Sequence, residues 1–222
     1  MQKMLPPGQF EIEDFPRFGL TKYADRYKAE REPLSLRIRG DVDTPLTLDA
    51  ENLASLPRVT QVSDFHCVTS WSKCGLEWRG YRFRDVYEKI IKPDAKPHAD
   101  ATFVILKSTD GYRAILPLED LLGDDVLLAD TLDGEALCAA HGAPLRLLAP
   151  AHYGSKSVKH ITTVEFWSDD SKYVAPAFKF MGHPRGRVAY EERSGSVPGW
   201  ILRYLYRPLI KPTIRLFKRT MK

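Results

Sequence analysis

Residues 64–72 of the chain read DFHCVTSWS, and this stretch decides how the rest of the sequence is interpreted. It follows an apolar, β-prone run at residues 59–65 and places Cys67 at the end of the expected strand, next to His66. A thiol in such a position is suited to chemistry, because its thiolate form is both a nucleophile and a metal ligand. A free cysteine is also commonly a small buried hydrophobic residue. The stretch alone leaves both interpretations open.

Length and composition indicate a folded soluble protein. The 222 residues suit one domain with extensions, and a hydrophobic content of 43% with 28% charged residues is ordinary for globular chains. No stretch of about 18 uninterrupted apolar residues is present, so we expect no transmembrane helix. The three cysteines are odd in number and form no C-x-x-C pair, which argues against a disulfide framework or a structural zinc site. Residues 1–10 show neither an apolar run nor a twin arginine, so we expect a cytoplasmic protein.

The hydrophobic pattern predicts short strands and a few short helices without βαβ alternation, which indicates an α+β or mostly β fold. Turn signals at Asp110-Gly111 and Asp133-Gly134 predict two hairpins. A Ser/Thr/Trp/Gly-rich loop is expected after Cys67. Strands are expected at 34–39, 59–65, 78–83, 101–106, 112–116, 126–129, 145–149 and 161–167, and helices at 49–56, 83–91 and 117–122.

Three stretches together resemble a known family. They are DFHCVTSWS at 64–72, GAPLR at 142–146 and YGSKSVK at 153–159. The chain resembles the molybdenum-cofactor domain of the sulfite oxidase family over residues 14–167, and within it the short, stand-alone bacterial branch related to the catalytic subunit of a methionine-sulfoxide reductase. The resemblance implies an α+β, mixed-sheet, sulfite-oxidase-type molybdopterin-binding domain at 34–175. An N-terminal arm (1–33) would pack on the cofactor site, and a basic C-terminal strap (176–222) would follow.

The resemblance also implies a metal ligand. One thiolate cannot hold a metal alone, so a ligand role for Cys67 requires that a cofactor supply the others. In the family, molybdenum is held by the dithiolene sulfurs of one molybdopterin, by oxo or hydroxo groups and by one cysteine, and Cys67 lies at that position. His66 and Trp71 also match the pattern. Cys74 and Cys138 match no ligand position, and packing or an exposed thiol explains them.

Further cofactor contacts follow from the same resemblance. Arg146 projects from a Gly/Pro turn, and its guanidinium suits a phosphate; without the resemblance it would be a solvated or paired charge. Departures from the family are His141 and Asp14, each standing where relatives carry Asn. The Lys159 ammonium group and the Ser157 hydroxyl could form an anion nest with backbone N–H groups. The expected cofactor-binding residues are Arg17, Phe18, His66, Cys67, Ser108, His141, Arg146, Ser157, Val158 and Lys159.

The expected hairpin tip at 107–113 could lie at the mouth of the metal site. Tyr112 and Arg113 are then catalytic candidates beside Cys67, and an anionic substrate such as sulfite would need cations, for which Arg113, Lys107 and His66 are available. A hairpin tip that merely carries surface charges is the alternative.

The resemblance implies a molybdenum- and molybdopterin-dependent oxidoreductase that transfers an oxygen atom to or from a small sulfite-like, S-oxide or N-oxide substrate. An external electron carrier is required, since the chain shows no second redox centre. The alternative is a non-catalytic module that docks on anionic membrane or nucleic acid through its tail. Residues 179–222 contain 11 Lys/Arg and 2 Asp/Glu. Pro208 and Pro212 are expected to break a long amphipathic helix, which favours a strap or a subunit contact over a membrane surface, and no nucleic-acid partner is expected.

Overall fold

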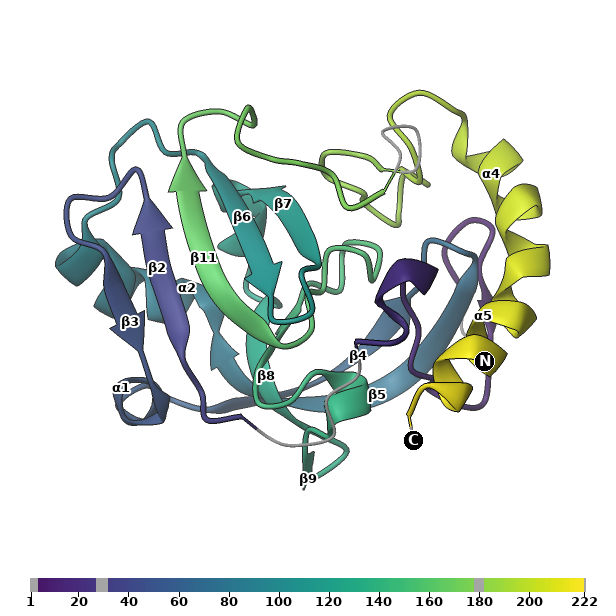
Figure 1. Cartoon of the computed structure of the whole chain (residues 1–222), viewed down its shortest axis with the longest axis horizontal. Helices are drawn as coiled ribbons and strands as arrows, with labels where there is room; N and C mark the ends of the chain where they lie inside the picture. Colours follow the sequence, from purple (N-terminus) through teal and green to yellow (C-terminus); the bar gives the residue numbers. More distant parts are fainter. Residues whose placement is uncertain (1–3, 27–31, 178–181, 222) are drawn as a thin grey trace.

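The structure, a computed structural model, describes residues 4–26, 32–177 and 182–221. In this part of the chain the strands form two sheets (Figure 1). The first sheet has the order β1-β5-β8-β10, with β4 also paired to β5 and β9 to β8. Its strands are β1 (Phe10–Glu11), β4 (Val59–His66), β5 (Trp71–Arg82), β8 (Leu127–Leu132), β9 (Glu135–Ala136) and β10 (Arg146–Leu148).

The second sheet mixes parallel and antiparallel pairs, as the α+β interpretation requires. Strand β2 runs parallel to β11, and the other neighbours are antiparallel. The expected hairpin around Asp110-Gly111 is confirmed as the pair β6–β7, and β8–β9 confirms the one at Asp133-Gly134. The order is β3 (Leu46–Leu48), β2 (Leu36–Gly40), β11 (Ile161–Trp167), β6 (Phe103–Ser108) and β7 (Arg113–Pro117).

The expected loop after Cys67 is limited to residues 68–70, and strand β5 begins at Trp71, inside the stretch expected to be a loop. The connection is a tight turn, in which the Cys67 N–H donates to the Trp71 carbonyl (2.8 Å) and the Ser70 N–H to the Cys67 carbonyl (3.0 Å). Strand β5 then pairs with β4 on one side and with β8 on the other. Buried Trp71 and Trp78 anchor it, because aromatic side chains stabilise a half-buried pleated surface.

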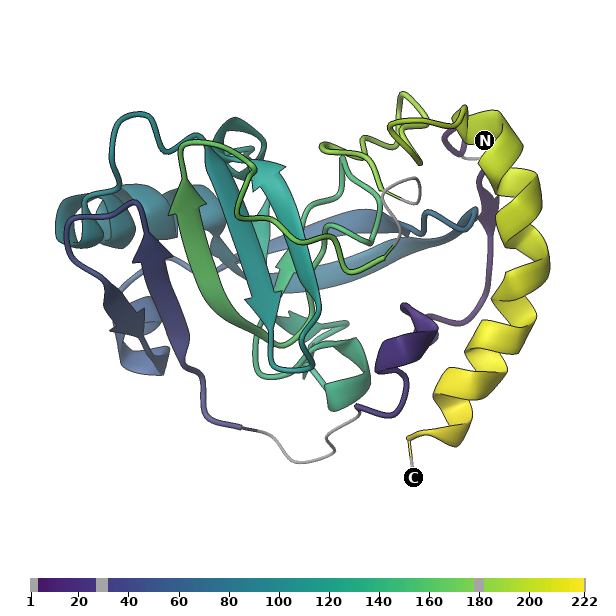
Figure 2. The same ribbon diagram turned by 45° about the horizontal axis from the view of Figure 1, so that its top comes forward.

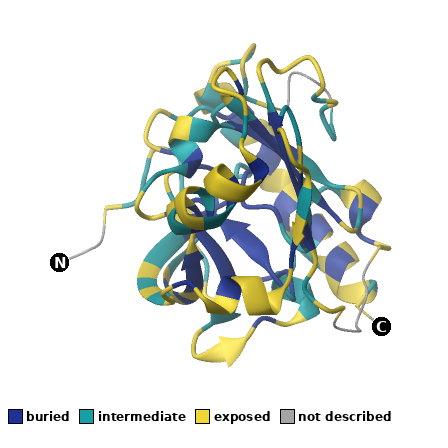
Figure 3. Cartoon of the chain, turned by 90° about the vertical axis from the view of Figure 1, so that its left-hand side faces the viewer, coloured by how far each residue is buried: buried dark blue, intermediate teal, exposed yellow. Residues whose placement is uncertain are grey.

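Short helices cover the sheets. Helix α1 (Ala50–Ala54) begins at Asp49, whose carboxylate accepts the N–H groups of Glu51 and Asn52 in a capping box. Helix α3 (Leu118–Leu121) follows β7 directly. Helix α2 (Phe83–Val86) continues as a π-helical segment through Ala95 and includes Pro93, so the expected end of this helix at residue 91 was wrong. The wider turn accommodates a residue that lacks an N–H. At the end of the molecule where α1 and α2 lie, exposed residues are on the outer turns, and buried strands lie behind them (Figure 3).

The C-terminal region is one helical run, contrary to the expectation that its prolines interrupt it. Helix α4 (Gly199–Tyr206), the 3-10 turn Arg207–Leu209 and helix α5 (Ile210–Arg219) follow one another and stand beside the N-terminal arm (Figure 2). Pro208 lies at the start of the 3-10 turn and Pro212 in the first turn of α5, where the N–H group is needed least. None of the described helices is both long and apolar enough to span a bilayer.

Two hydrophobic cores lie on the first sheet. One is shared with the second sheet and with α1 and α2. The other contains Cys67 and includes Ile210 of α5, with Phe15 and Phe18 of the arm packed against it. In β8, Leu127 and Ala129 belong to the second core and Leu128 to the first, as alternation along a strand requires. The arm and the C-terminal run therefore pack on the sheet face that carries Cys67.

The division into arm (1–33), domain (34–175) and strap (176–222) stays a prediction, and residues 1–3, 27–31, 178–181 and 222 of the arm and strap lie outside the described residues.

Candidate functional site

A cavity of about 890 Å³ lies where the Cys67 turn, the β6–β7 hairpin and residues 153–160 meet the N-terminal and C-terminal segments. Arg17 to Arg26 supply one wall, and Tyr206 to Phe217 of the C-terminal helices supply another. The volume is within the range of roughly 300–1,000 Å³ found for sites of small molecules and cofactors. The region is therefore shaped to enclose a ligand rather than to bind on a flat surface.

Cys67 lines this cavity from the end of β4. Its Sγ lies 3.1 Å from the Thr69 hydroxyl. Its carbonyl accepts the Gln9 side-chain amide of the arm (3.1 Å), and the Val68 carbonyl accepts the guanidinium of Arg193. Segments far apart in sequence thus hold the cysteine turn from both sides, which fixes the direction of the sulfur.

Burial raises the pKa of the Cys67 thiol, while the hydrogen bond from Thr69 and the charges of Arg193 and Lys159 oppose that rise. The protein alone therefore keeps this sulfur protonated. A bound metal ion would deprotonate it outright. The described residues contain no group of three or more His, Cys, Asp or Glu side chains that could hold a metal, so a metal on Cys67 would need other ligands from a cofactor.

Buried cations surround the cavity. Lys156 donates to the carbonyls of Ile115 (2.8 Å) and Pro184 (2.6 Å), and Lys159 donates to that of Ala140 (2.9 Å). In the part of the chain that the structure describes, neither ammonium group forms an ion pair. Desolvation lowers the pKa of each lysine to about 7. Buried positive charge without a carboxylate partner favours an anionic ligand.

Arg146 adds a third buried cation behind the wall. Its guanidinium donates to the His141 carbonyl (2.9 Å) and the Ser157 carbonyl (3.4 Å), and it lies over the rings of Trp78 (4.9 Å) and Phe65 (5.4 Å). Desolvation lowers its pKa to about 9. It holds two segments of the wall in place and adds positive potential to the cavity.

Polar atoms at the cavity surface also indicate a polar ligand. Trp71, Ser108 and Tyr206 line the cavity, and the indole nitrogen and both hydroxyl oxygens are buried without a hydrogen-bond partner among the described residues. Native proteins satisfy nearly all buried polar atoms. One thiol, ammonium groups that form no ion pair among the described residues, and unsatisfied donors fit a polar, anionic cofactor that brings its own metal ligands.

Gly154 carries a testable packing constraint. Its N–H donates to the His66 carbonyl (2.7 Å), and a Cβ placed on it would meet the ring of Phe65 well inside van der Waals distance. We expect Gly154→Ala to lower the free energy of unfolding by about 1–3 kcal/mol, the usual cost of overpacking. Urea unfolding measures this change. Gly195→Ala is the matched control, because a Cβ there makes only ordinary contacts; an equal loss in both variants would contradict the steric explanation.

The structure brings seven of the residues expected from the sequence to the cavity surface and leaves five behind it. The lining residues are Arg17, Phe18, Cys67, Ser108, Tyr112, Ser157 and Lys159. Five expected residues are absent from the cavity lining that the described residues form: His66, Arg113, His141, Arg146 and Val158.

Strand geometry explains several of these positions. His66 precedes Cys67 and bonds to the Ser72 hydroxyl (2.7 Å), since neighbouring side chains on a strand point to opposite faces. The His141 ring stacks on Phe15 with ring centroids 4.6 Å apart, and Val158 is buried in the shared core.

The hairpin supplies fewer cations than expected. Lys107 pairs with Glu165 (2.7 Å), so the expectation that it faces an anionic substrate was wrong. Tyr112 does line the cavity, and its hydroxyl donates to the Ser155 carbonyl (2.6 Å). Burial raises the pKa of Tyr112, so the phenol stays protonated.

The expected anion nest is also incomplete. The N–H groups of Gly154, Lys156, Ser157 and Val158 already donate to carbonyls of the chain. The Ser157 hydroxyl accepts the Ala149 N–H (3.2 Å). The ammonium groups of this loop, rather than its backbone, are available to an anion.

Sequence analysis missed Arg193, which is 1% exposed and lines the cavity. It donates to the carbonyls of Val68 and Pro7, pairs with Glu191 (3.3 Å) and lies over the Tyr153 ring (5.0 Å). No motif marks it, because it belongs to a Gly/Arg/Glu-rich segment without a hydrophobic period. It links the cysteine turn to the arm and the C-terminal segment.

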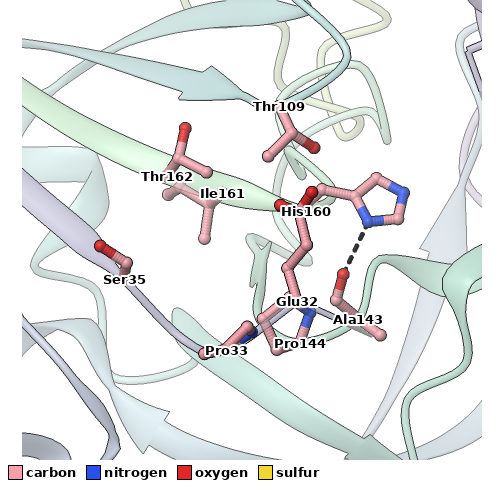
Figure 4. Close-up of a pocket in the computed structure, with 9 residues that line it drawn as sticks. All are labelled: Glu32, Pro33, Ser35, Thr109, Ala143, Pro144, His160, Ile161 and Thr162. Carbon is pink, nitrogen blue, oxygen red and sulfur yellow. Dashed lines mark hydrogen bonds between the residues drawn. The ribbon is translucent and has the colours of Figure 1, made fainter. Parts of the chain in front are cut away.

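A second, smaller pocket of about 70 Å³ lies beside the cavity and shares His160 with it (Figure 4). His160 has a positive φ of 49°, and its Nδ1 lies 2.7 Å from the Ala143 carbonyl. Glu32 and Ser35 line the same pocket. Its volume admits water molecules and excludes a cofactor.

Comparisons with known proteins agree with this geometry. A family model described as the oxidoreductase molybdopterin binding domain matches residues 24–174. The chain is 34% identical to a Bacillus subtilis (strain 168) protein named uncharacterized oxidoreductase YuiH, over 75% of this chain and 80% of that protein. It is 29% identical to the protein-methionine-sulfoxide reductase catalytic subunit MsrP of Campylobacter jejuni, over 71% of this chain and 61% of that protein.

A solved structure supports the fold. The crystal structure of the sulfane dehydrogenase SoxCD from Paracoccus pantotrophus is similar with a TM-score of 0.55 and 22% identity. The match covers 69% of this chain and 43% of that chain. This likeness extends to the sulfite-oxidase-type mixed-sheet architecture and carries no statement about substrate.

Proposed function

Because the chain belongs to the oxidoreductase molybdopterin binding domain family, we propose that it transfers an oxygen atom to or from a small substrate, with Cys67 as the protein ligand of molybdenum. The chain is an oxidoreductase, and its cofactor is molybdopterin with molybdenum. When bound, this cofactor supplies two-electron redox chemistry and a site for the transferred oxygen. The observation that carries the proposal is the cavity that joins Cys67 to the Lys159 ammonium group, which forms no ion pair among the described residues.

The residues of the chain would divide the work by position. Cys67 would hold the metal end of the cofactor, and Lys159 and Ser157 would hold an anionic end. Arg17 and Phe18 of the arm would cover it from the opposite wall. Arg146, with His66, His141 and Val158, would support these groups from behind. Tyr112 would offer a protonated phenol at the hairpin side, while Arg113 remains a weaker candidate because it does not line the cavity.

A small sulfite-like or sulfoxide substrate and an external electron carrier complete the proposal. The relative named as a methionine-sulfoxide reductase is a catalytic subunit, which supports a separate electron-transfer partner. Reduction of a sulfoxide consumes two electrons and two protons and yields a sulfide and water, whereas sulfite oxidation takes an oxygen atom from water and yields sulfate, two protons and two electrons.

The test is metal and pterin analysis of the freshly purified chain, followed by two assays with a redox dye. One assay supplies reduced dye with methionine sulfoxide, and the other supplies oxidised dye with sulfite. Stoichiometric molybdenum with turnover in either assay is the expected result. A chain that holds stoichiometric molybdenum without turnover of any oxygen-atom donor or acceptor would contradict the proposed reaction.

The buried lysines predict a pH dependence for the cofactor-free chain. Lys156 and Lys159 have folded pKa values of about 7 each, below the value of about 10.4 in an unfolded chain. Above pH 7 the unfolded chain therefore binds protons that the folded chain does not, so the free energy of unfolding should rise with pH. The window is about pH 7 to 8.5, above the range where histidines titrate and below that of cysteines and tyrosines.

Urea unfolding across this window measures the slope. Lys156→Met and Lys159→Met should each flatten it, since an uncharged side chain of similar length has no proton to lose. Lys92→Met, at an exposed helical position, is the control and should leave the slope unchanged. A slope of zero in the unmodified chain would show that both lysines keep ordinary pKa values.

Two other expectations have different outcomes. A non-catalytic binding module was the alternative function, and membership of an oxidoreductase family overturns it. The cytoplasmic location expected from residues 1–10 stays a prediction. Fractionation of cells that express the native gene would test it.

A further inference from the structure

The outer side of the C-terminal helical run has two flanks of different chemistry. Its inner face packs on the protein through Leu202, Tyr206, Ile210, Thr213 and Phe217, which are buried. Exposed apolar side chains lie along one outer flank at helical spacing, and exposed cations lie along the other. The apolar flank contains Ile201, Leu205, Pro208, Pro212 and Leu216, and the basic flank contains Arg207, Lys211, Arg215 and Lys218.

The apolar flank is unusual for a solvent-facing helix. Leu205 is 61% exposed and Leu216 37%. Trp200 and Tyr204, at the start of the run, are also exposed, and the guanidinium of Arg207 lies over the rings of both Tyr204 (5.8 Å) and Phe10 of the arm (5.7 Å). Such clusters of exposed apolar side chains mark interaction surfaces. Aromatic residues with a polar edge next to cations are typical of the boundary between water and a bilayer.

The charge of this region is of one sign. Residues 193–222 contain no Asp or Glu. Among the described residues, Lys211, Arg215, Lys218 and Arg219 are exposed and form no ion pair. A second copy of the chain docking through the same face would bring like charges together, which costs free energy. A surface of negative phospholipid headgroups over an apolar layer complements both flanks at once.

We propose that the outer face of the helical run at 199–219 docks on an anionic phospholipid bilayer. The cations would lie among the headgroups, and Leu205, Leu216 and Trp200 would enter the boundary of the acyl chains. The run also forms a cavity wall through Tyr206, Thr213 and Phe217. Docking would therefore hold the cavity close to the membrane surface.

Flotation of the full chain with vesicles tests the proposal. Vesicles of phosphatidylcholine mixed with phosphatidylglycerol are compared with pure phosphatidylcholine vesicles at low and high salt. Each basic residue near an anionic surface strengthens binding by roughly fivefold. We therefore expect Lys211→Gln with Arg215→Gln and Lys218→Gln to weaken binding to the mixed vesicles on the order of a hundredfold. High salt should weaken binding of the unmodified chain in the same direction.

The matched control removes the same charge elsewhere. Lys89→Gln with Lys92→Gln and Lys96→Gln alters three exposed cations at the α2 end of the molecule, far from α4 and α5 (Figure 1), and should bind like the unmodified chain. Leu205→Ser with Leu216→Ser should also weaken binding, which separates docking from a purely electrostatic contact.

Several outcomes would overturn the proposal. They are equal binding to both kinds of vesicle, equal loss in the control variant, and sedimentation showing that this face is the interface of a dimer. Tighter binding to duplex DNA than to the mixed vesicles at the same salt would also overturn it. Circular dichroism and molybdenum content unchanged in each variant show that folding is retained.

Discussion

Cys67→Ser should purify without stoichiometric molybdenum and should lose the oxidoreductase activity of the unmodified chain. A serine hydroxyl is a harder, less acidic donor than a thiol, and soft thiolate ligands favour soft or borderline metal centres. The loss should exceed the roughly 10–100-fold loss seen when a residue that only orients a metal ligand is changed. Metal analysis, pterin fluorescence and the dye assay measure the effect, and the visible absorption of thiolate bonded to metal should disappear.

The other two cysteines provide the control. Cys74 is partly buried on β5 and Cys138 is exposed, and neither lines the cavity among its described residues. Cys74→Ser and Cys138→Ser should both retain molybdenum and activity. Folding of Cys67→Ser is checked separately by urea unfolding, because the small change in volume should cost little. Stoichiometric molybdenum retained in Cys67→Ser would reject the ligand role.

The sequence predicts the fold where local pattern and packing agree. Strand β11 has the predicted bounds, because alternation and β-branched residues coincide there. The hairpin β6–β7 follows from Asp110-Gly111. The predicted helix ends were wrong at Pro93, Pro208 and Pro212. Proline is disfavoured in the interior of an ordinary α-helix, but here it lies in a π-helical segment, a 3-10 turn and a first helical turn. Those exceptions depend on tertiary packing, which no local window contains.

The sequence likewise predicts one part of the candidate site and misses another. Cys67, Ser157 and Lys159 come from short motifs in the central domain, and the structure brings them to one cavity. His66 and Val158 belong to the same motifs, yet the alternation of a strand and the packing of a loop turn their side chains away. Arg193 is more than a hundred residues from Cys67 in sequence, and only the folded chain shows that its guanidinium reaches the Val68 carbonyl.

Arg193→Ala should lower the free energy of unfolding by roughly 2–3 kcal/mol, because hydrogen bonds to a buried charged group contribute about 1.5–3 kcal/mol. The substitution takes a donor from the carbonyls of Val68 and Pro7, and it leaves Glu191 with Arg203 as its ion-pair partner (3.7 Å). Since these bonds join the cysteine turn to the arm and to the C-terminal segment, their loss should also open the cavity beside Cys67. Urea unfolding measures the first effect.

Thiol reactivity measures the second effect. In a Cys74→Ser, Cys138→Ser background, Cys67 is the one thiol, and maleimide should modify it faster in cofactor-free Arg193→Ala than in the same background with Arg193. Arg84→Ala is the matched control, because Arg84 pairs with Asp124 at the exposed surface and should contribute about 1 kcal/mol or less. If Arg193→Ala unfolds at the same urea concentration as the control and leaves Cys67 equally protected, Arg193 does not hold the cysteine turn, and packing of the helices alone must close this side of the cavity.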